Sequence, residues 1–143
     1  MDYSRLAKVL SSNGCSLTRA REQVFGALVD KEGLTMNELI DELSGKVDRV
    51  SVYRNVTLFE KLGILQRISN GFKYKVELSD NFSSHHHHLS CSQCGRVINI
   101  KADQLEGAIK QLGKDHGFVI SGHQVEIRGS CAQCVHEQDK EVG

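Results

Sequence analysis

Residues 49–78 read RVSVYRNVTLFEKLGILQRISNGFKYKVEL, and this stretch decides the fold of the first half of the chain. Its apolar residues Val52, Val56, Phe59 and Leu62 recur at helical spacing. They predict a helix over residues 50–62 that ends at Gly63. Two short runs, ILQRIS and FKYKVEL, then flank Asn70-Gly71, a dipeptide typical of tight β-hairpin turns. The stretch therefore predicts a helix followed by a two-stranded hairpin.

Helical patterns continue towards the N-terminus. Thr18 is expected to cap a helix that buries Val24, Phe25 and Leu28. The run TMNE at 35–38 has the form of a capping box and opens a further short helix. Helices followed by a two-stranded wing form a winged helix-turn-helix, with the helix of residues 50–62 in the recognition position.

The polar face of that recognition helix carries cationic, amide, hydroxyl and aromatic groups, which reach phosphates and base edges in the DNA major groove. The expected contacts with double-stranded DNA are Ser51, Tyr53, Arg54, Asn55 and Thr57. The same face would also suit an ordinary solvated helix, and the wing that follows tips the interpretation towards DNA. The chain as a whole carries no net charge, but residues 1–75 hold 12 Lys and Arg against 9 Asp and Glu. A nucleic-acid surface is therefore expected in the first half.

The second half begins after SDNFSS, residues 79–84, a polar segment predicted to be a hinge. Residues 85–95 then read HHHHLSCSQCG. Cys91 and Cys94 form one Cys-x-x-Cys pair, and Cys131 and Cys134 form another 36 residues later. Four thiolates make a closed tetrahedral zinc site, which would join the two ends of a small domain and stabilise it. The cysteines therefore predict structural Zn(II) rather than disulfides.

The four histidines alternate if their backbone is extended, so that His85 and His87 face one way and His86 and His88 the other. One run can thus serve two metal sites. Around it, RVINI, GFVIS and HQVEIRG predict strands, and a helix from Asp103 buries Leu105, Ile109 and Leu112. The tail from Val135 is charged and predicts no ordered element.

The predicted fold is α+β, with a winged-helix DNA-binding domain at 1–78, a hinge at 79–84 and a zinc-stapled α/β domain at 85–143. No stretch is long and apolar enough for a membrane span or a signal peptide, so a cytoplasmic protein without membrane contact is expected. Two other function classes stay open on the residues alone. One is a metallohydrolase with Glu106 as base, against which no nucleophile motif appears. The other is a zinc-binding interaction module that never touches DNA.

The chain resembles the ferric uptake regulator (Fur) family of metal-sensing repressors over nearly its whole length. The resemblance rests on SVYRNVTLFEKLGIL, the Asn70-Gly71 wing, HHHHLSCSQCG, HGFVISGHQVEIRGSC and the terminal CAQC. It implies a non-enzymatic, homodimeric repressor that binds operator DNA, acts on no small organic substrate and dimerises through its C-terminal α/β domain. It also implies structural zinc on Cys91, Cys94, Cys131 and Cys134.

The resemblance further implies two regulatory sites for a divalent metal. The first would comprise His85, His87, Glu106 and His123, and the second Glu77, His86 and His88. Tyr53 and Arg54 fall where the family's recognition helix meets DNA, and Arg21 matches a basic position on the second helix.

Three departures from the family pattern bear on the sensed metal. Gly33 replaces a histidine and Asn99 an acidic residue that iron-sensing and peroxide-sensing members use in the second site, which argues against a peroxide sensor. Iron sensors tend to have an aspartate where this chain has His87. Three imidazoles and one carboxylate suit tetrahedral zinc, so Zn(II) is the favoured regulatory metal and Fe(II) or Mn(II) the alternative.

Overall fold

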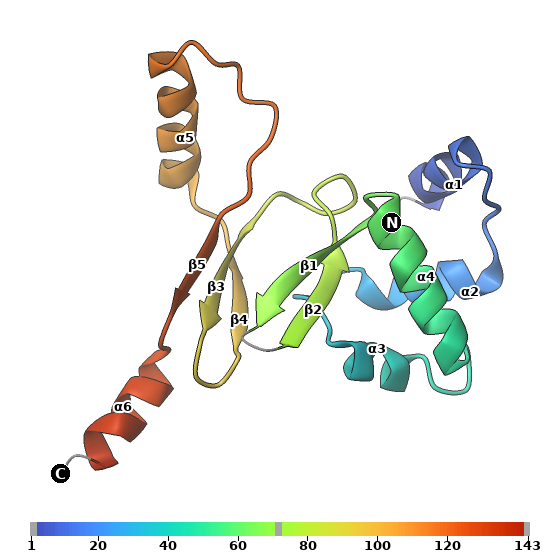
Figure 1. Ribbon diagram of the computed structural model, residues 1–143, viewed down its shortest axis with the longest axis horizontal. Helices are drawn as coiled ribbons and strands as arrows, with labels where there is room; N and C mark the ends of the chain where they lie inside the picture. Colours follow the sequence, from blue (N-terminus) through green and yellow to red (C-terminus); the bar gives the residue numbers. More distant parts are fainter. Residues whose placement is uncertain (1–2, 71–72, 142–143) are drawn as a thin grey trace. The chain divides into compact units, whose positions relative to one another are not determined.

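The computed structural model describes residues 3–70 and 73–141, which divide into two compact units, 1–84 and 85–143. Within the described part of the first unit, helices precede a two-stranded sheet (Figure 1). The elements are α1 (Tyr3–Ser12), α2 (Arg19–Leu28), α3 (Met36–Glu42), α4 (Arg49–Lys61), β1 (Leu65–Asn70) and β2 (Lys73–Leu78). This is the predicted winged helix-turn-helix order, with α4 as recognition helix.

Side chains at the helix starts explain where the helices begin. Thr18 accepts a hydrogen bond from the backbone N–H of Arg21 at the start of α2. Thr35 and Glu38 form the predicted capping box of α3, each accepting from the other's backbone N–H. Asp48 caps α4 by accepting from the N–H of Ser51. These bonds satisfy amide groups that have no partner inside the helix.

The wing is an antiparallel pair in which Leu65 lies opposite Leu78 and Asn70 opposite Lys73. Gly63 adopts a φ of +69°, a left-handed conformation that glycine takes without strain, and this ends the α4 region before β1. Leu34, just before α3, forms an isolated antiparallel bridge with Val76, so the loop before α3 pairs with the wing. The predicted turn at Asn70-Gly71 lies partly outside the described residues.

An apolar core fills the first unit. Its largest fully buried side chains are Phe25 from α2 and Phe59 from α4, and Leu6, Leu39 and Val76 join them from α1, α3 and β2. Each helix turns its apolar stripe inward, as the spacing predicts. The core therefore fixes the recognition helix against the other three helices and the wing.

The segment predicted as hinge, residues 79–84, is a turn that belongs to the first unit. The Ser79 hydroxyl donates to the Gly63 carbonyl at 2.7 Å, and the backbone N–H of Phe82 donates to the Ser79 carbonyl at 2.8 Å. Phe82 packs on the apolar core. Movement of the two units about this segment stays a prediction.

The described part of the second unit is built on a three-stranded sheet. Its elements are β3 (His87–Cys91), β4 (Val97–Ile100), α5 (Asp103–Asp115), β5 (Glu126–Gly129) and α6 (Ala132–Glu141). β3 is the central strand, antiparallel to β4 and parallel to β5. The parallel pair requires a long crossover between β3 and β5, which contains β4 and α5.

Two sequence predictions for the second unit are wrong. GFVIS, residues 117–121, forms no strand, and within residues 3–70 and 73–141 no strand pairs with it. The charged tail is not frayed at its start but forms α6. Cys134 in the first turn of α6 is 7% exposed, which anchors the helix at the cysteine cluster.

Helix α5 carries an apolar face that its own chain leaves open. In Figure 1 it rises beyond one end of the strands rather than lying across their face. Leu112 is 60% exposed, and Phe118 and Val119, in the segment after the helix, are exposed as well. The prediction that Leu112 belongs to the core is therefore wrong for the single chain, whereas Leu105 and Ile109 are half-buried. Among the described residues, no helix is long and apolar enough to cross a membrane.

Candidate metal centres and DNA-binding surface

The four predicted zinc cysteines converge at one place. Cys91 ends β3, Cys94 lies in the turn after it, and Cys131 and Cys134 lie at the start of α6. The Cys91 and Cys134 sulfurs are 3.8 Å apart, as are those of Cys94 and Cys131. Sulfurs held at about 2.3 Å around a tetrahedral ion stand about 3.8 Å from one another. The four thiols are free rather than disulfide-bonded, and their spacing fits a zinc ion.

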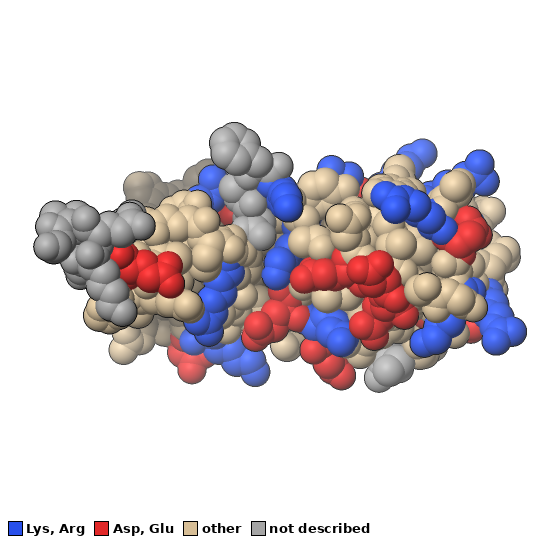
Figure 2. Space-filling view, turned by 90° about the horizontal axis from the view of Figure 1, so that it is seen from below, with Lys and Arg blue, Asp and Glu red and all other residues tan. Residues whose placement is uncertain are grey.

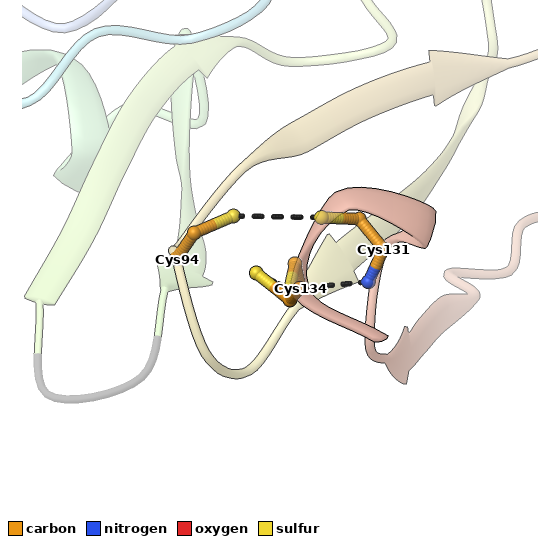
Figure 3. Close-up of side chains that lie close together, drawn as sticks. Cys94, Cys131 and Cys134 are labelled. Carbon is orange, nitrogen blue, oxygen red and sulfur yellow. Dashed lines mark hydrogen bonds between the residues drawn. The ribbon is translucent and has the colours of Figure 1, made fainter. Parts of the chain in front are cut away.

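The local fold explains this convergence. Gly95 follows the first pair with a φ of +74°, which allows the chain to turn back into β4. The parallel pairing of β3 with β5 then brings residues 88–91 beside 126–129, directly before the second pair. Figure 3 shows the Cys94 sulfur facing that of Cys131, with Cys134 beside them on the first turn of α6.

The cysteine environments differ in their effect on thiol ionisation. Backbone N–H groups of Cys94, Cys131 and Gln93 donate to the Cys91 sulfur and lower its pKa to about 6. The Cys131 amide lies 3.3 Å from that sulfur. The hydrogen bond with Cys131, together with burial, instead raises the pKa of Cys134 to about 12. The two buried thiols therefore differ in how readily they ionise.

The second cluster contains the first predicted regulatory site. Its members are His85, His87, Glu106 and His123. The Glu106 Oε1 atom lies 3.1 Å from His85 Nε2, 2.5 Å from His87 Nε2 and 3.0 Å from His123 Nε2. Three imidazole nitrogens and one carboxylate oxygen thus point at a common centre. His87 is 2% exposed, so this centre reaches into the unit's interior.

The same cluster holds Glu106 in its charged form. Desolvation raises the pKa of this carboxyl group, but hydrogen bonds with His123 and His87 outweigh it and lower the pKa to about 2. Glu106 lies in the first turn of α5, and the three rings come from β3, the residues before it and the segment before β5. The cluster therefore ties α5 to the sheet by polar groups.

The other face of the histidine run is also polar and buried. His86 and His88 rings stack edge to face at 4.9 Å, and His88 is 4% exposed. Asn99 lies directly opposite His88 on β4, and its buried Oδ1 atom has no hydrogen-bond partner among the described residues. Alternation of the histidines along the strand is as predicted.

Glu77, the remaining predicted ligand of the second site, belongs to the first unit. It is 2% exposed in β2, and the Gln66 amide donates to its Oε1 at 2.7 Å. Gln66 lies directly opposite Glu77 on the neighbouring strand. Its joining with His86 and His88 would draw ligands from both units and stays a prediction.

The recognition helix exposes part of the predicted DNA-binding set. Tyr53, Arg54 and Thr57 are exposed on α4. Ser51 is half-buried, and its hydroxyl donates to the Asp48 cap at 2.6 Å. Asn55 is 8% exposed and points inward, so its placement on the exposed face is wrong. Helical geometry explains the error, since Asn55 lies three residues after Val52 and next to Val56 on the buried stripe.

Arg21 lies at the start of α2, where its guanidinium donates to the Ser16 carbonyl in the loop between α1 and α2. It is half-buried, and so it braces this loop rather than extending freely into solvent. Its predicted contact with DNA stays a prediction.

Sequence reasoning missed a connection between the recognition helix and the wing. The Glu60 carboxylate on α4 pairs with Arg67 on β1, and the Arg67 guanidinium lies 4.2 Å from the centre of the Tyr74 ring on β2. Tyr74, Tyr53 and Lys73 line a groove of about 300 Å³ together with the start of α3. The sequence alone does not indicate this connection, because placing Arg67 beside Tyr74 requires knowledge of the strand register.

Acidic and basic side chains are mixed on the face of the molecule seen in Figure 2. This agrees with the zero net charge of the whole sequence.

Comparison with known proteins places these sites in a family. The model of the Ferric uptake regulator family matches residues 12–128. A ferric uptake regulation protein of Bacillus subtilis is 30% identical over 137 residues, covering 91% of this chain and 92% of that protein. The peroxide-responsive repressor PerR of Staphylococcus saprophyticus is also 30% identical over 137 residues, covering 92% and 88%.

Solved structures agree with the sequence comparison. The crystal structure of the Vibrio cholerae ferric uptake regulator matches with a TM-score of 0.68 and 28% identity, covering 87% of this chain and 98% of that one. Iron regulators and peroxide-responsive repressors both occur among the relatives, so relatedness does not decide which signal this protein senses. The match over most of the chain, the winged helix and the His and Cys clusters together show that this protein belongs to the ferric uptake regulator family of metal-responsive, DNA-binding transcriptional repressors, which are not enzymes.

Proposed function

We propose that this protein is a zinc-sensing repressor that binds operator DNA as a homodimer in the cytoplasm. The observation that carries the proposal is the cluster of His85, His87 and His123 around Glu106. All four ligand positions are supplied by protein groups, so the cluster would form a closed site without an open position for catalysis. Iron or manganese sensing by the same site is the competing reading.

The chemistry of the donors supports zinc. Imidazole nitrogen binds Zn(II) well, and Zn(II) accepts a tetrahedral set of three nitrogens and one oxygen. Mn(II) prefers more oxygen ligands and six-fold coordination. The Glu106 Oε1 atom lies 2.5–3.1 Å from the three ring nitrogens, so the four donors already converge on one place, and the preference for zinc rests on the donor types.

A second zinc is proposed to have a structural role on the four cysteines. The sulfur spacing of 3.8 Å supports this assignment. Thiolate ligands bind zinc far more tightly than an exchangeable site does, so this ion would stay bound while the histidine cluster empties and fills.

DNA recognition is proposed to depend on the exposed part of α4, with Tyr53, Arg54 and Thr57 reaching the major groove. Metal would raise the affinity for DNA, and by thermodynamic reciprocity operator DNA would then raise the affinity for metal by the same factor. Two copies of the winged helix would read a pseudo-palindromic operator, because a two-fold dimer presents the same surface twice.

The deciding experiment is DNA binding to an operator library by protein that retains its structural zinc. The protein is titrated with buffered Zn(II), Mn(II) and anaerobic Fe(II). The proposal expects activation by Zn(II) at the lowest free-metal concentration and no activation by Fe(II). Activation by Fe(II) or Mn(II) alone would show that zinc is not the sensed metal, and binding that ignores every metal would overturn the regulatory proposal.

Arg54→Ala tests the recognition helix. Loss of a base contact is expected to cost about 1–3 kcal/mol of operator affinity and to relax sequence preference at one position. Lys61→Ala, at the far end of the same helix, is the matched control and should keep the preference. Unchanged operator binding by Arg54→Ala would show that α4 does not meet the DNA as proposed.

A further inference from the structure

The segment that leads out of the DNA-binding unit is held against that unit by its own backbone. The Ser79 N–H donates to the Ile64 carbonyl at 2.9 Å, and its hydroxyl donates to the Gly63 carbonyl at 2.7 Å. The Ser83 N–H and hydroxyl both donate to the Ser79 carbonyl, at 3.0 Å and 3.3 Å. These bonds close residues 79–83 into a turn. The segment is therefore ordered, although its polar composition is typical of a flexible linker.

Phe82 anchors this turn in the apolar core. Its ring meets the Phe25 ring edge to face at 5.7 Å, and the Arg5 guanidinium lies 5.5 Å from its centre. Phe25, only 1% exposed, also contacts Tyr3 at 5.4 Å. Phe82 thus joins an aromatic cluster formed with α1 and α2. Among residues 79–84, it is the side chain that packs on the core.

Anchoring at Phe82 shortens the chain that is free to move before the metal ligands. A flexible linker of six residues spans roughly 13 Å on average, whereas one of two residues spans roughly 8 Å. After Phe82, Ser83 and Ser84 are the residues that precede His85. A metal ion would restrain the positions of His85–His88. A long flexible linker would not transmit this restraint to the DNA-binding unit, whereas a short linker would.

We propose that Phe82 is a positioning residue for metal-dependent DNA binding, which fixes where the chain leaves the DNA-binding unit. The inference rests on the proposed metal-dependent DNA binding and adds the route by which the metal acts. Phe82 touches neither metal nor DNA in this role. Because Phe82 is anchored, only Ser83 and Ser84 of the predicted six-residue hinge lie between the anchor and the histidines.

The test compares operator affinity with and without Zn(II) in the full-length protein. Phe82→Ala is expected to lower the metal-dependent gain in affinity about tenfold, within the usual range of coupling between two sites. Metal-free operator affinity and the Co(II) spectrum of the histidine cluster should not change. Phe82→Leu, which keeps an apolar anchor, should restore most of the gain. Asn81→Ala, exposed in the same turn, is the matched control and should behave as wild type.

A linker insertion separates positioning from a simple loss of stability. Two glycines inserted after Ser84 should reduce the gain in the wild type but have little further effect in Phe82→Ala, because both changes slacken the same segment. Equal loss in both backgrounds, or a normal gain in Phe82→Ala, would overturn the inference. A wild-type protein without any metal-dependent gain would instead overturn the proposed function.

Discussion

The two units of this chain are stabilised in different ways. The core cluster of buried apolar side chains lies within the first unit, where helices and wing enclose Phe25, Phe59 and their neighbours. In the described part of the second unit, the buried apolar residues are Cys91, Val97 and Cys134. Its interior is otherwise polar, with His87, His88 and Ser90 buried. One unit is held by hydrophobic burial and the other by groups that can bind metal.

The difference fits the proposal that the second unit is the one that responds to metal. A unit with its own apolar core folds whether or not a metal is present, and so it can keep its DNA-reading surface ready. The second unit, with thiols and imidazoles in its interior, would gain stability from bound ions, and from a second copy if one covers the exposed Leu112 and Phe118. The first unit is therefore expected to fold without metal, and the second unit to depend on it.

Loss of one zinc ligand should give the largest effect and break this comparison most directly. Cys91→Ser is expected to lose the structural zinc and unfold the second unit, because zinc binding by such sites supplies about 10–16 kcal/mol. Metal content and amide hydrogen exchange would be measured together. Residues of the first unit should keep their protection.

Cys15→Ser is the matched control, since Cys15 lies outside the cluster, and it should retain zinc. A Cys91→Ser protein that keeps a protected second unit without zinc would show that the polar interior is stable by itself. The contrast between the units would then be wrong.

The reverse experiment removes apolar burial from the first unit. Phe59 is fully buried, so Phe59→Ala should lower the free energy of unfolding by about 3–5 kcal/mol, measured with urea. Zinc content should stay unchanged. Val50→Ala, on an exposed position of the same helix, should change the unfolding free energy by no more than about 0.5 kcal/mol. A loss of zinc in Phe59→Ala would show that the units are not independent.

A change on α5 tests the part of the second unit that a partner would stabilise. Leu112→Asp places a charge on an apolar position that is 60% exposed in the single chain. The dimer dissociation constant, measured by sedimentation equilibrium, should rise about 30-fold or more, which corresponds to about 2 kcal/mol of dimer stability. Gln104→Asp, exposed on the same helix, should leave it unchanged. Unaltered dimers in Leu112→Asp would place the interface elsewhere.

The smallest expected effect concerns the acid stability of the histidine cluster without metal. The pKa of Glu106 is lowered to about 2, so its folded state favours the carboxylate. Its contribution to stability should be fully present above about pH 4.5, the usual value for a glutamate, and be lost as the pH falls towards 2. Carboxyl NMR of the metal-free protein would follow this titration. A midpoint near 4.5 would show that the rings do not hold the carboxylate.

Much of this architecture could be predicted from local patterns. The capping box at Thr35 and Glu38, the stripe of Val52, Val56 and Phe59, and the alternation of the histidines depend on neighbours in sequence. The cysteine cluster was predictable because two matching Cys-x-x-Cys pairs are typical of a metal site. These features have in common that the residues themselves carry the signal.

The remaining features depend on contacts between distant residues. Asn55 looks like a surface amide until the helix is placed on its core, and Glu77 looks like a solvent-facing carboxylate until Gln66 is found across the sheet. Phe82 stands in a polar run, and nothing local indicates that Phe25 lies beside it. The prediction of a strand at GFVIS was wrong for the opposite reason. Its local pattern favours a strand, but among the described residues no strand pairs with it.

The parallel pairing of β3 with β5 also determines the order in which the protein can fold during its synthesis. The wing strands β1 and β2 are adjacent in sequence and can pair as soon as they leave the ribosome. β3 must wait for β5, which follows β4 and α5, and only then do the two cysteine pairs meet. With zinc on those cysteines, capture of the ion and closure of the sheet become one event. The zinc available to the newly made chain would therefore decide how many molecules ever become able to sense a metal.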